Sequence, residues 1–194
     1  ALSLSDQGQY AEAEALYREA LEIQEGVLGT EHPDTLLSLN NLAGSLYLQG
    51  HYAEAEALSR RALEIQERVL GPEHPDALLS LNNLALSLAN QGQYAEAEAL
   101  NRKVLEIRER VLGPEHPDTL WSLNNLALSL RNQGQYAEAE ALHRKVLEIR
   151  ERVLGPEHPD TLESLNNLAL SLSYQGKYAE AEALYREVLE IRER

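Results

Sequence analysis

The sequence predicts an all-α solenoid in which antiparallel helix-turn-helix repeats stack side by side. Three observations predict it. The sequence repeats itself every 42 residues, and single glycines interrupt each repeat at two fixed places. Between the glycines, apolar residues recur three and four positions apart, which is the spacing of an amphipathic helix. Leu, Ala, Glu, Arg and Gln dominate these stretches, and all five form helices readily.

The repeat keeps its register along the whole chain without an insertion. The positions that recur at this period include Gly8, Gly50, Gly92, Gly134 and Gly176, Tyr10, Tyr52, Tyr94, Tyr136 and Tyr178, and Pro33, Pro75, Pro117 and Pro159. A fixed period of this length is the signature of stacked repeats. We therefore predict one repeat domain over 1–194, with a partial repeat 1–33 and repeats 34–75, 76–117, 118–159 and 160–194. Ala1 falls midway along a predicted helix, so we expect a fragment of a longer array.

Each repeat begins with a helix that we call helix A. In repeat 118–159 it follows His116 and Pro117, because proline is tolerated in the first helical turn and Asp118 favours the positive end of the helix dipole. Helix A ends near Gly134, since glycine adopts the left-handed conformation of a helix end. The apolar stripe of helix A consists of Leu120, Leu123, Leu126, Ala127 and Leu130.

The second helix, helix B, is predicted from about Tyr136 to Leu154, and Gly155-Pro156 ends it. Its inner stripe consists of Ala139, Leu142, Val146, Leu147 and Ile149. The short turn between the helices makes them antiparallel neighbours. Neither helix can bury its stripe alone, so successive hairpins must stack.

The spacing of Leu126-Ala127, Leu130, Gly134, Tyr136, Ala139 and Val146 resembles the signature of the tetratricopeptide repeat (TPR). Glu151 stands where that family usually has a closing proline, and helix B continues for about one more turn. The motifs L-N-N-L-A, Q-G-x-Y-x-E-A-E and V-L-G-P-x-H-P resemble the longer repeats of kinesin light chain and related bacterial arrays. The resemblance covers the whole chain. It implies a right-handed α-solenoid whose A helices line a concave groove that binds proteins or peptides.

Composition excludes several classes of function. The net charge of −15 argues against a nucleic acid partner, because phosphate binding needs clustered Lys and Arg. No apolar run approaches the roughly 20 residues that span a bilayer, and no signal peptide is visible. The chain has no Cys, which fits a reducing compartment and also fits removal by a designer. We expect a cytoplasmic protein without a membrane partner.

The few differences between copies fall mainly in one sector of helix A, roughly 100° wide and opposite the Leu stripe. The resemblance implies that this sector faces the groove. We predict that its residues bind the ligand: Asn40, Asn82, Asn124 and Asn166, which do not change, and Leu79, Trp121, Glu163, Tyr47, Arg131, Asn90, Asn132 and Tyr174, which stand at changing positions. Solvent exposure alone would also allow the residues of this sector to differ between copies. The A-E-A-E-A segment of helix B is exposed as well, however, and it hardly differs between copies.

The recurring asparagines form a ladder that could hold an extended peptide backbone, since a carboxamide both donates and accepts hydrogen bonds. Trp121, Tyr47, Arg131 and Tyr174 are the best candidates for side-chain anchors. For the second asparagine of each pair we favour a bond to a neighbouring helix. These second asparagines are Asn41, Asn83, Asn125 and Asn167.

Catalytic and metal sites are not predicted, and neither is a cofactor. The loop histidines His32, His74, His116 and His158 would lie roughly 10 Å apart in stacked helices, too far to share a metal at about 2 Å. We assign them to helix capping and turns. Glu138 and Glu140 belong to a solvated acidic face rather than to an acid–base pair, because nothing places them in an apolar pocket.

Three functions remain open from the sequence. The first is a scaffold that binds a protein or an extended peptide. Kinesin light chain holds peptides that are often acidic, but Glu163 and Asp6 accompany the groove cations here, so an acidic ligand is not predicted. The second is a structural or engineered consensus-like array with no dedicated ligand, which associates end to end through uncapped terminal repeats. The third is the sensor arm of a larger bacterial signalling ATPase.

Overall fold

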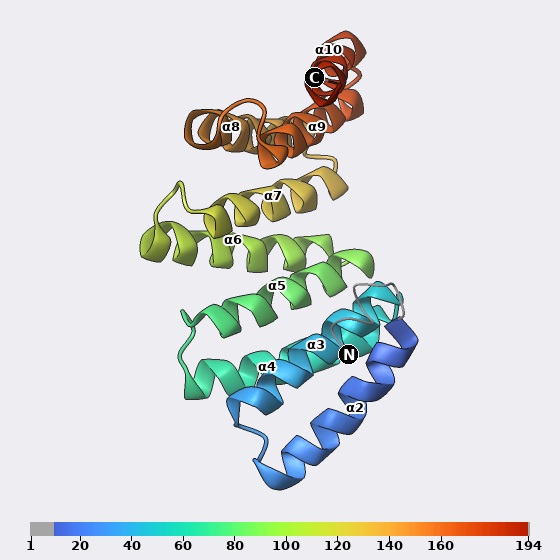
Figure 1. Cartoon of the computed structure of the whole chain (residues 1–194), viewed down its shortest axis with the longest axis vertical. Coiled ribbons are helices and arrows are strands. Elements are labelled where there is room, and N and C mark those ends of the chain that lie inside the picture. The colour runs from blue at the N-terminus through green and yellow to red at the C-terminus, as the bar shows by residue number, and fades with distance from the viewer. Residues whose placement is uncertain (1–9, 194) are drawn as a thin grey trace. The chain divides into compact units, whose positions relative to one another are not determined.

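All regular structure in the described part of the chain is helical (Figure 1). The computed structural model describes residues 10–193, so Asp6, Gly8 and the rest of 1–9 lie outside the described residues, as does Arg194. The helices are α2 (Tyr10–Val27), α3 (Pro33–Leu48), α4 (Tyr52–Val69), α5 (Pro75–Asn90), α6 (Tyr94–Leu112), α7 (Pro117–Asn132), α8 (Tyr136–Leu154), α9 (Pro159–Tyr174) and α10 (Tyr178–Arg192). The odd-numbered helices from α3 to α9 are A helices and the even-numbered ones are B helices. The all-α prediction is confirmed.

The chain divides into two compact units, Ala1–Leu100 and Asn101–Arg194, which we call unit 1 and unit 2. The division falls within α6. Unit 1 holds α2 to α5, and unit 2 holds α7 to α10. Within each unit, helices that follow one another in the chain pack against each other, as the hairpin prediction requires (Figure 1).

Each A helix begins at a histidine cap. Nδ1 of His116 accepts a hydrogen bond from the backbone N–H of Asp118 at 3.2 Å, and Pro117 occupies the first turn. The same bond recurs at His32, His74 and His158. The histidines therefore satisfy one backbone donor that the helix start would otherwise leave unpaired. This confirms their predicted capping role.

Glycine ends each A helix. Gly134 has a φ of +78°, the left-handed region that glycine enters without strain. The N–H of Gln135 donates to the carbonyl of Leu130, and the N–H of Gly134 donates to the carbonyl of Arg131, both at 2.9 Å. These two bonds form a Schellman motif, which satisfies carbonyls of the last helical turn. The chain then reverses at once into α8.

The predicted Leu stripe of α7 is buried. Leu126, Ala127 and Leu130 pack on Ala139 of α8, and Leu120 and Leu123 pack on Val146. Each leucine that leaves water contributes roughly 1.5–3 kcal/mol, so this stripe holds the hairpin together. In α8, the stripe residues Leu142, Leu147 and Ile149 are only partly buried. Two polar residues of α8, His143 and Arg150, are more deeply buried than these three.

Carboxylates of the A-E-A-E-A segments link successive repeats within a unit. Oε2 of Glu140 in α8 accepts hydrogen bonds from Gln175 at 2.7 Å and from Lys177 at 2.8 Å. Arg144 pairs with the other carboxylate oxygen of Glu140, also at 2.7 Å. These cations and the amide lower the pKa of Glu140 to about 2, with Lys177 the largest cause. The prediction that Glu140 belongs to a solvated acidic face was wrong, because Gln175 and Lys177 of the next repeat cover its carboxylate.

Candidate functional site

A pocket of about 250 Å³ lies on the A-helix side of unit 2. Its lining comes from α7 (Trp121, Asn124, Asn125, Leu128 and Arg131), from α9 (Glu163 and Asn167) and from α8 (His143). Four of the predicted ligand-binding residues therefore meet in one cavity, namely Trp121, Asn124, Arg131 and Glu163. The indole of Trp121 is 40% exposed, so a ligand can contact it.

The wall behind Trp121 carries a buried cation. Arg108 of α6 is nearly inaccessible, and its guanidinium lies 5.5 Å from the centre of the indole ring. Nη1 of Arg108 donates to the carbonyl of Asp118 at 3.1 Å and to Oγ of Ser122 at 2.8 Å. Burial lowers the pKa of Arg108 below its ordinary value. The indole face stabilises the guanidinium that these hydrogen bonds hold in place.

Arg150 of α8 occupies the equivalent place one repeat later. It is 7% exposed, and its Nη1 donates to the carbonyl of Asp160 at 2.7 Å and to Oγ of Ser164 at 2.9 Å. The same nitrogen reaches a carboxylate oxygen of Glu163 at 3.2 Å. A predicted groove residue, Glu163, is thus held in an ion pair by a cation from the neighbouring helix B.

The floor of the pocket contains a buried histidine. His143 is 5% exposed, and Nδ1 lies 3.2 Å from Oδ1 of Asn124. Burial, and secondarily the nearby Arg131, lowers the pKa of His143 to about 4. The ring is therefore neutral at pH 7, and its Nδ1–H donates to Asn124. Nδ2 of Asn125 is buried at the same pocket without a hydrogen-bond partner. The amide nitrogen of Asn125 therefore makes no hydrogen bond to a neighbouring helix.

At the C-terminal end of α7, Arg131 lies over the ring of Tyr174 in α9, at 5.3 Å from its centre. The Tyr174 ring stacks on Tyr136 at 5.5 Å. Tyr174 remains 52% exposed, and Asn132 of α7 is also exposed. Asn166 is half-buried on α9 but does not line the pocket. A cation and an aromatic face therefore continue the A-helix surface next to the pocket.

In unit 1 the equivalent asparagines, Asn40 and Asn82, are buried. Asn40 is 4% exposed, and its Oδ1 accepts a hydrogen bond from Oγ of Ser80 at 2.7 Å. Asn82 is 1% exposed, and neither polar atom of its amide has a hydrogen-bond partner. In this arrangement neither side chain reaches a ligand. The ladder of accessible asparagines is therefore confined to Asn124 and Asn166, which are half-buried.

The other predicted residues of unit 1 lie near the surface. Leu79 is exposed on α5. Nδ2 of Asn90 donates to the hydroxyl of Tyr47 at 3.0 Å, and the Tyr47 ring lies 5.5 Å from that of Tyr52. These residues do not gather at one of the pockets found in unit 1.

Sequence reasoning missed three residues that shape the pocket, namely Arg108, Arg150 and His143. A signal was present for each. The copies differ at the place that holds Gln24, Gln66, Arg108 and Arg150, and at the place that holds Ser59, Asn101 and His143. These positions lie on helix B and face helix A from behind, outside the sector of helix A in which most differences between copies fall.

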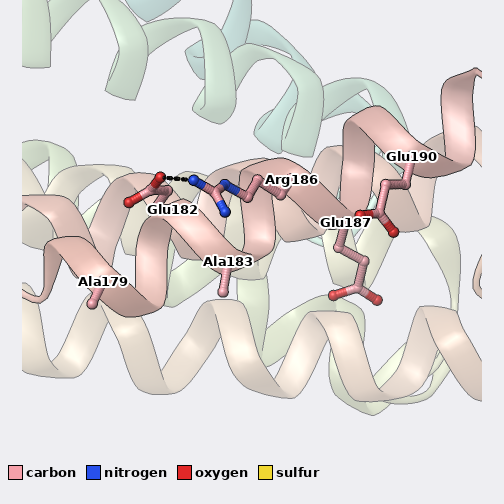
Figure 2. A pocket seen from close by; sticks show the side chains of 6 residues that line it. All are labelled: Ala179, Glu182, Ala183, Arg186, Glu187 and Glu190. Atoms are coloured by element: carbon pink, nitrogen blue, oxygen red, sulfur yellow. Dashed lines mark hydrogen bonds and ion pairs between the residues drawn. The ribbon is translucent and has the colours of Figure 1, made fainter.

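A second hollow, of about 310 Å³, lies along α10 (Figure 2). Its lining comes from this helix alone, and Glu182 pairs with Arg186 within it. Glu182 is equivalent to Glu140 of α8. The hollow therefore lies on the face of α10 that corresponds to the face of α8 where Gln175 and Lys177 bind Glu140. In the described residues we find no group of three or more His, Asp or Glu that could hold a metal ion. No helix there is long and apolar enough to cross a membrane.

Two sequence models of the tetratricopeptide repeat match the chain, one over residues 1–68, 38–89 and 123–194 and the other over residues 78–118. Among solved structures, the nearly identical TPR-like repeats of a kinesin light chain-like protein from Podosopora anserina share 34% identity. That match covers 98% of this chain and 90% of that one, with a TM-score of 0.84.

BtubC (BKLC) from P. vanneervenii is 24% identical and has a TM-score of 0.80, and the match covers 97% of this chain and 75% of that one. Rap protein complexed with competence and sporulation factor also has a TM-score of 0.80, at 17% identity over 98% of this chain and 51% of that one. These two likenesses concern the fold. A search of curated proteins finds no match to the chain.

Proposed function

Because this chain belongs to the tetratricopeptide repeat family, whose fold supports protein-interaction scaffolds, we propose that it binds an extended peptide or protein segment on its A helices. The pocket around Trp121 is the anchor point, and the surface continues over Arg131 and Tyr174. Binding is the whole activity of this chain. The proposal includes no catalysis, cofactor or metal, and it places the protein in the cytoplasm.

One observation supports this proposal above the others: Trp121, Asn124, Arg131 and Glu163 line a single cavity although they were selected only as positions on one helix sector. The cavity combines an exposed aromatic face with amides and one guanidinium. Pockets that bind a segment of another protein have this character, with a large anchor side chain surrounded by a few directional polar groups.

The amides define what the ligand must present. Oδ1 of Asn124 accepts from His143, which leaves the Nδ2–H groups of this pocket residue available to a ligand. Nδ2 of Asn125 is buried in this structure and is not counted as a ligand contact. A peptide carbonyl placed here would pair with the Asn124 amide, and such a bond contributes about 1 kcal/mol net. An extended backbone supplies a carbonyl at every residue, which fits a peptide better than a compact apolar molecule.

A peptide-library pull-down tests the proposal. The full chain should enrich a family of peptides, and the double variant Asn124→Ala with Asn166→Ala should lose this enrichment while its circular dichroism stays helical. A matched control is Glu138→Gln, an exposed position away from the pocket on α8. Undiminished capture by the double variant would exclude the A-helix surface of unit 2 as the site.

Self-association is the second candidate, and the surface of α10 favours it. Tyr178, Tyr185 and Leu189 are exposed there, and Leu189 is 58% accessible. Under this hypothesis the chain is a structural or engineered array that assembles through such faces rather than a receptor for a peptide. Light scattering over a range of concentrations decides between them. A mass that stays monomeric at high concentration rules out assembly, and a mass that falls in Leu189→Glu supports it.

A further inference from the structure

A groove-facing residue of helix A changes between copies together with the buried residue of helix B behind it. The pairs are Gln24 with Leu37, Gln66 with Leu79, Arg108 with Trp121, and Arg150 with Glu163. A neutral amide accompanies leucine in the first two pairs. A guanidinium accompanies tryptophan or glutamate in the last two. Sequence comparison of the A helices alone does not reveal this coupling.

The buried residues occupy the same structural place in both units. In unit 1, Oε1 of Gln66 lies 2.6 Å from Oγ of Ser80. In unit 2, the serine one repeat later, Ser122, accepts from Arg108, and Ser164 accepts from Arg150. The substitution of arginine for glutamine thus places a positive charge where unit 1 has a neutral group.

A buried guanidinium must be compensated, because removing an ion from water costs several kcal/mol. The serine hydroxyl and one backbone carbonyl supply part of the compensation for Arg150. The rest comes from the helix A residue in front of it, which is the carboxylate of Glu163 at 3.2 Å. For Arg108 the corresponding partner is the indole face of Trp121. In both repeats the buried cation thus contacts the side chain that helix A presents in front of it.

We propose that Arg150 of α8 is a positioning residue that holds the side chain of Glu163, a residue of α9, in an ion pair and keeps its carboxylate from acting as a free anion toward a ligand. This inference rests on the proposed peptide-binding function of the pocket. Under this inference a residue of helix B determines which ligands the pocket selects. The ligand meets an ion pair without net charge at Glu163, so no cationic side chain is selected there. Arg150→Gln, which restores the residue type of unit 1, frees the carboxylate and makes the pocket select Lys or Arg.

Trp121 is the only tryptophan of the chain, and it lines the same pocket as Glu163, so its fluorescence reports the local charge without a ligand. Iodide and caesium quench an exposed indole, and their relative efficiency follows the sign of the charge around it. In Arg150→Gln the ratio of caesium to iodide quenching should rise severalfold at low ionic strength, because one unit charge nearby in water shifts the local concentrations of the two ions in opposite directions. Arg150→Lys should keep the original ratio, and Arg150→Gln with Glu163→Gln should restore it.

An unchanged ratio in Arg150→Gln, with helicity retained, overturns the proposal. Should that variant fail to fold, Glu163→Gln tests the pair from the other side. Arg150 then lacks its partner, iodide quenching should rise by a similar factor, and no change again overturns the proposal.

Peptide selection distinguishes the proposed role of Arg150 from a purely structural one, because a change in stability alone would not alter which peptides are selected. Libraries selected on Arg150→Gln should gain Lys or Arg at one position relative to libraries selected on the original chain, and Arg150→Lys should not show this gain. Selected peptides that bind both chains with the same preference would contradict the role of Arg150. The quenching measurements use no peptide, so failure of the peptide-binding function and failure of this inference are distinguishable.

Discussion

Nδ1 of His143 lies 3.2 Å from Oδ1 of Asn124, which joins a buried residue of α8 to the first amide of the pocket. This contact orients the Asn124 carboxamide, because the neutral ring can donate only to the oxygen of the amide. The amide nitrogen is then the half of the asparagine that this bond leaves available to a ligand.

The buried histidine makes stability depend on pH. Its pKa is lowered from 6.5 to about 4 in the folded chain, so the unfolded chain binds more protons between these values. Stability is complete above pH 6.5 and falls as the pH drops toward 4, by at most about 3 kcal/mol. Urea unfolding at pH 7 and pH 5 measures the fall. His143→Asn, which carries the residue of the preceding repeat, should lose less stability over this range, and an equal loss would contradict the assignment.

Glu140 should contribute to stability at neutral pH. Its folded pKa of about 2 lies below the ordinary 4.5, so its contribution is present above pH 4.5 and is lost as the pH falls toward 2. Removing the charge by Glu140→Gln should cost about 1 kcal/mol at pH 7, since three partners lose a carboxylate. Thermal unfolding with Glu138→Gln as the exposed control checks this. Equal midpoints for the two variants would argue that the linkage between α8 and the next repeat adds nothing.

The Leu stripe of α7 should dominate the stability of unit 2. Leu123 is fully buried against α8, and Leu123→Ala should cost 2–5 kcal/mol, roughly the range for cavities in packed cores. Leu37→Ala removes an exposed leucine from the equivalent helix of unit 1 and should change stability by less than about 0.5 kcal/mol. Chemical unfolding followed by circular dichroism compares them. Similar costs would show that the stripe is not the core.

Gly134 should be required for its backbone conformation rather than for space. A Cβ at this position would meet no atom within 4 Å, but its φ of +78° is strained for any residue with a side chain. Gly134→Ala should therefore lose about 1 kcal/mol. The comparison variant is Gly44→Ala, because Gly44 lies within α3 at an ordinary helical φ, and alanine should stabilise that helix. Stabilisation by both variants would contradict the Schellman end of α7.

Helix bounds followed from local chemistry and were predictable. Pro117 and Gly134 act through their own backbone, so α7 and the start and end of α8 lie where the sequence indicates. The burial of Arg150 could not be predicted in the same way. A charged residue on a helix is usually solvated, and only the packing of α8 on α9 removes this one from water. The same holds for Asn40, which occupies the predicted groove sector but is covered in the folded unit.

The sequence predicted which sector of helix A carries the candidate site, but it did not predict which side chains of that sector are accessible. Trp121, Arg131 and Glu163 were found because the copies differ at these positions, and Asn124 was found because it lies unchanged within the same sector of helix A. Their charges were not predictable. Glu163 counts as a free anion in the sequence, whereas Arg150 neutralises it in the structure. Interactions that pass from one repeat to the next determine the chemistry of the pocket, and a single repeat does not contain them.

Hydrogen–deuterium exchange of the full chain, with and without a peptide selected from a library, tests the central claim most directly. Binding on the A helices of unit 2 predicts that protection increases in α7 around Trp121–Arg131 and in α9 around Glu163–Asn167, while α10 stays unchanged. Protection confined to α10, or to the loops between repeats, would contradict the account and place the ligand elsewhere on the chain.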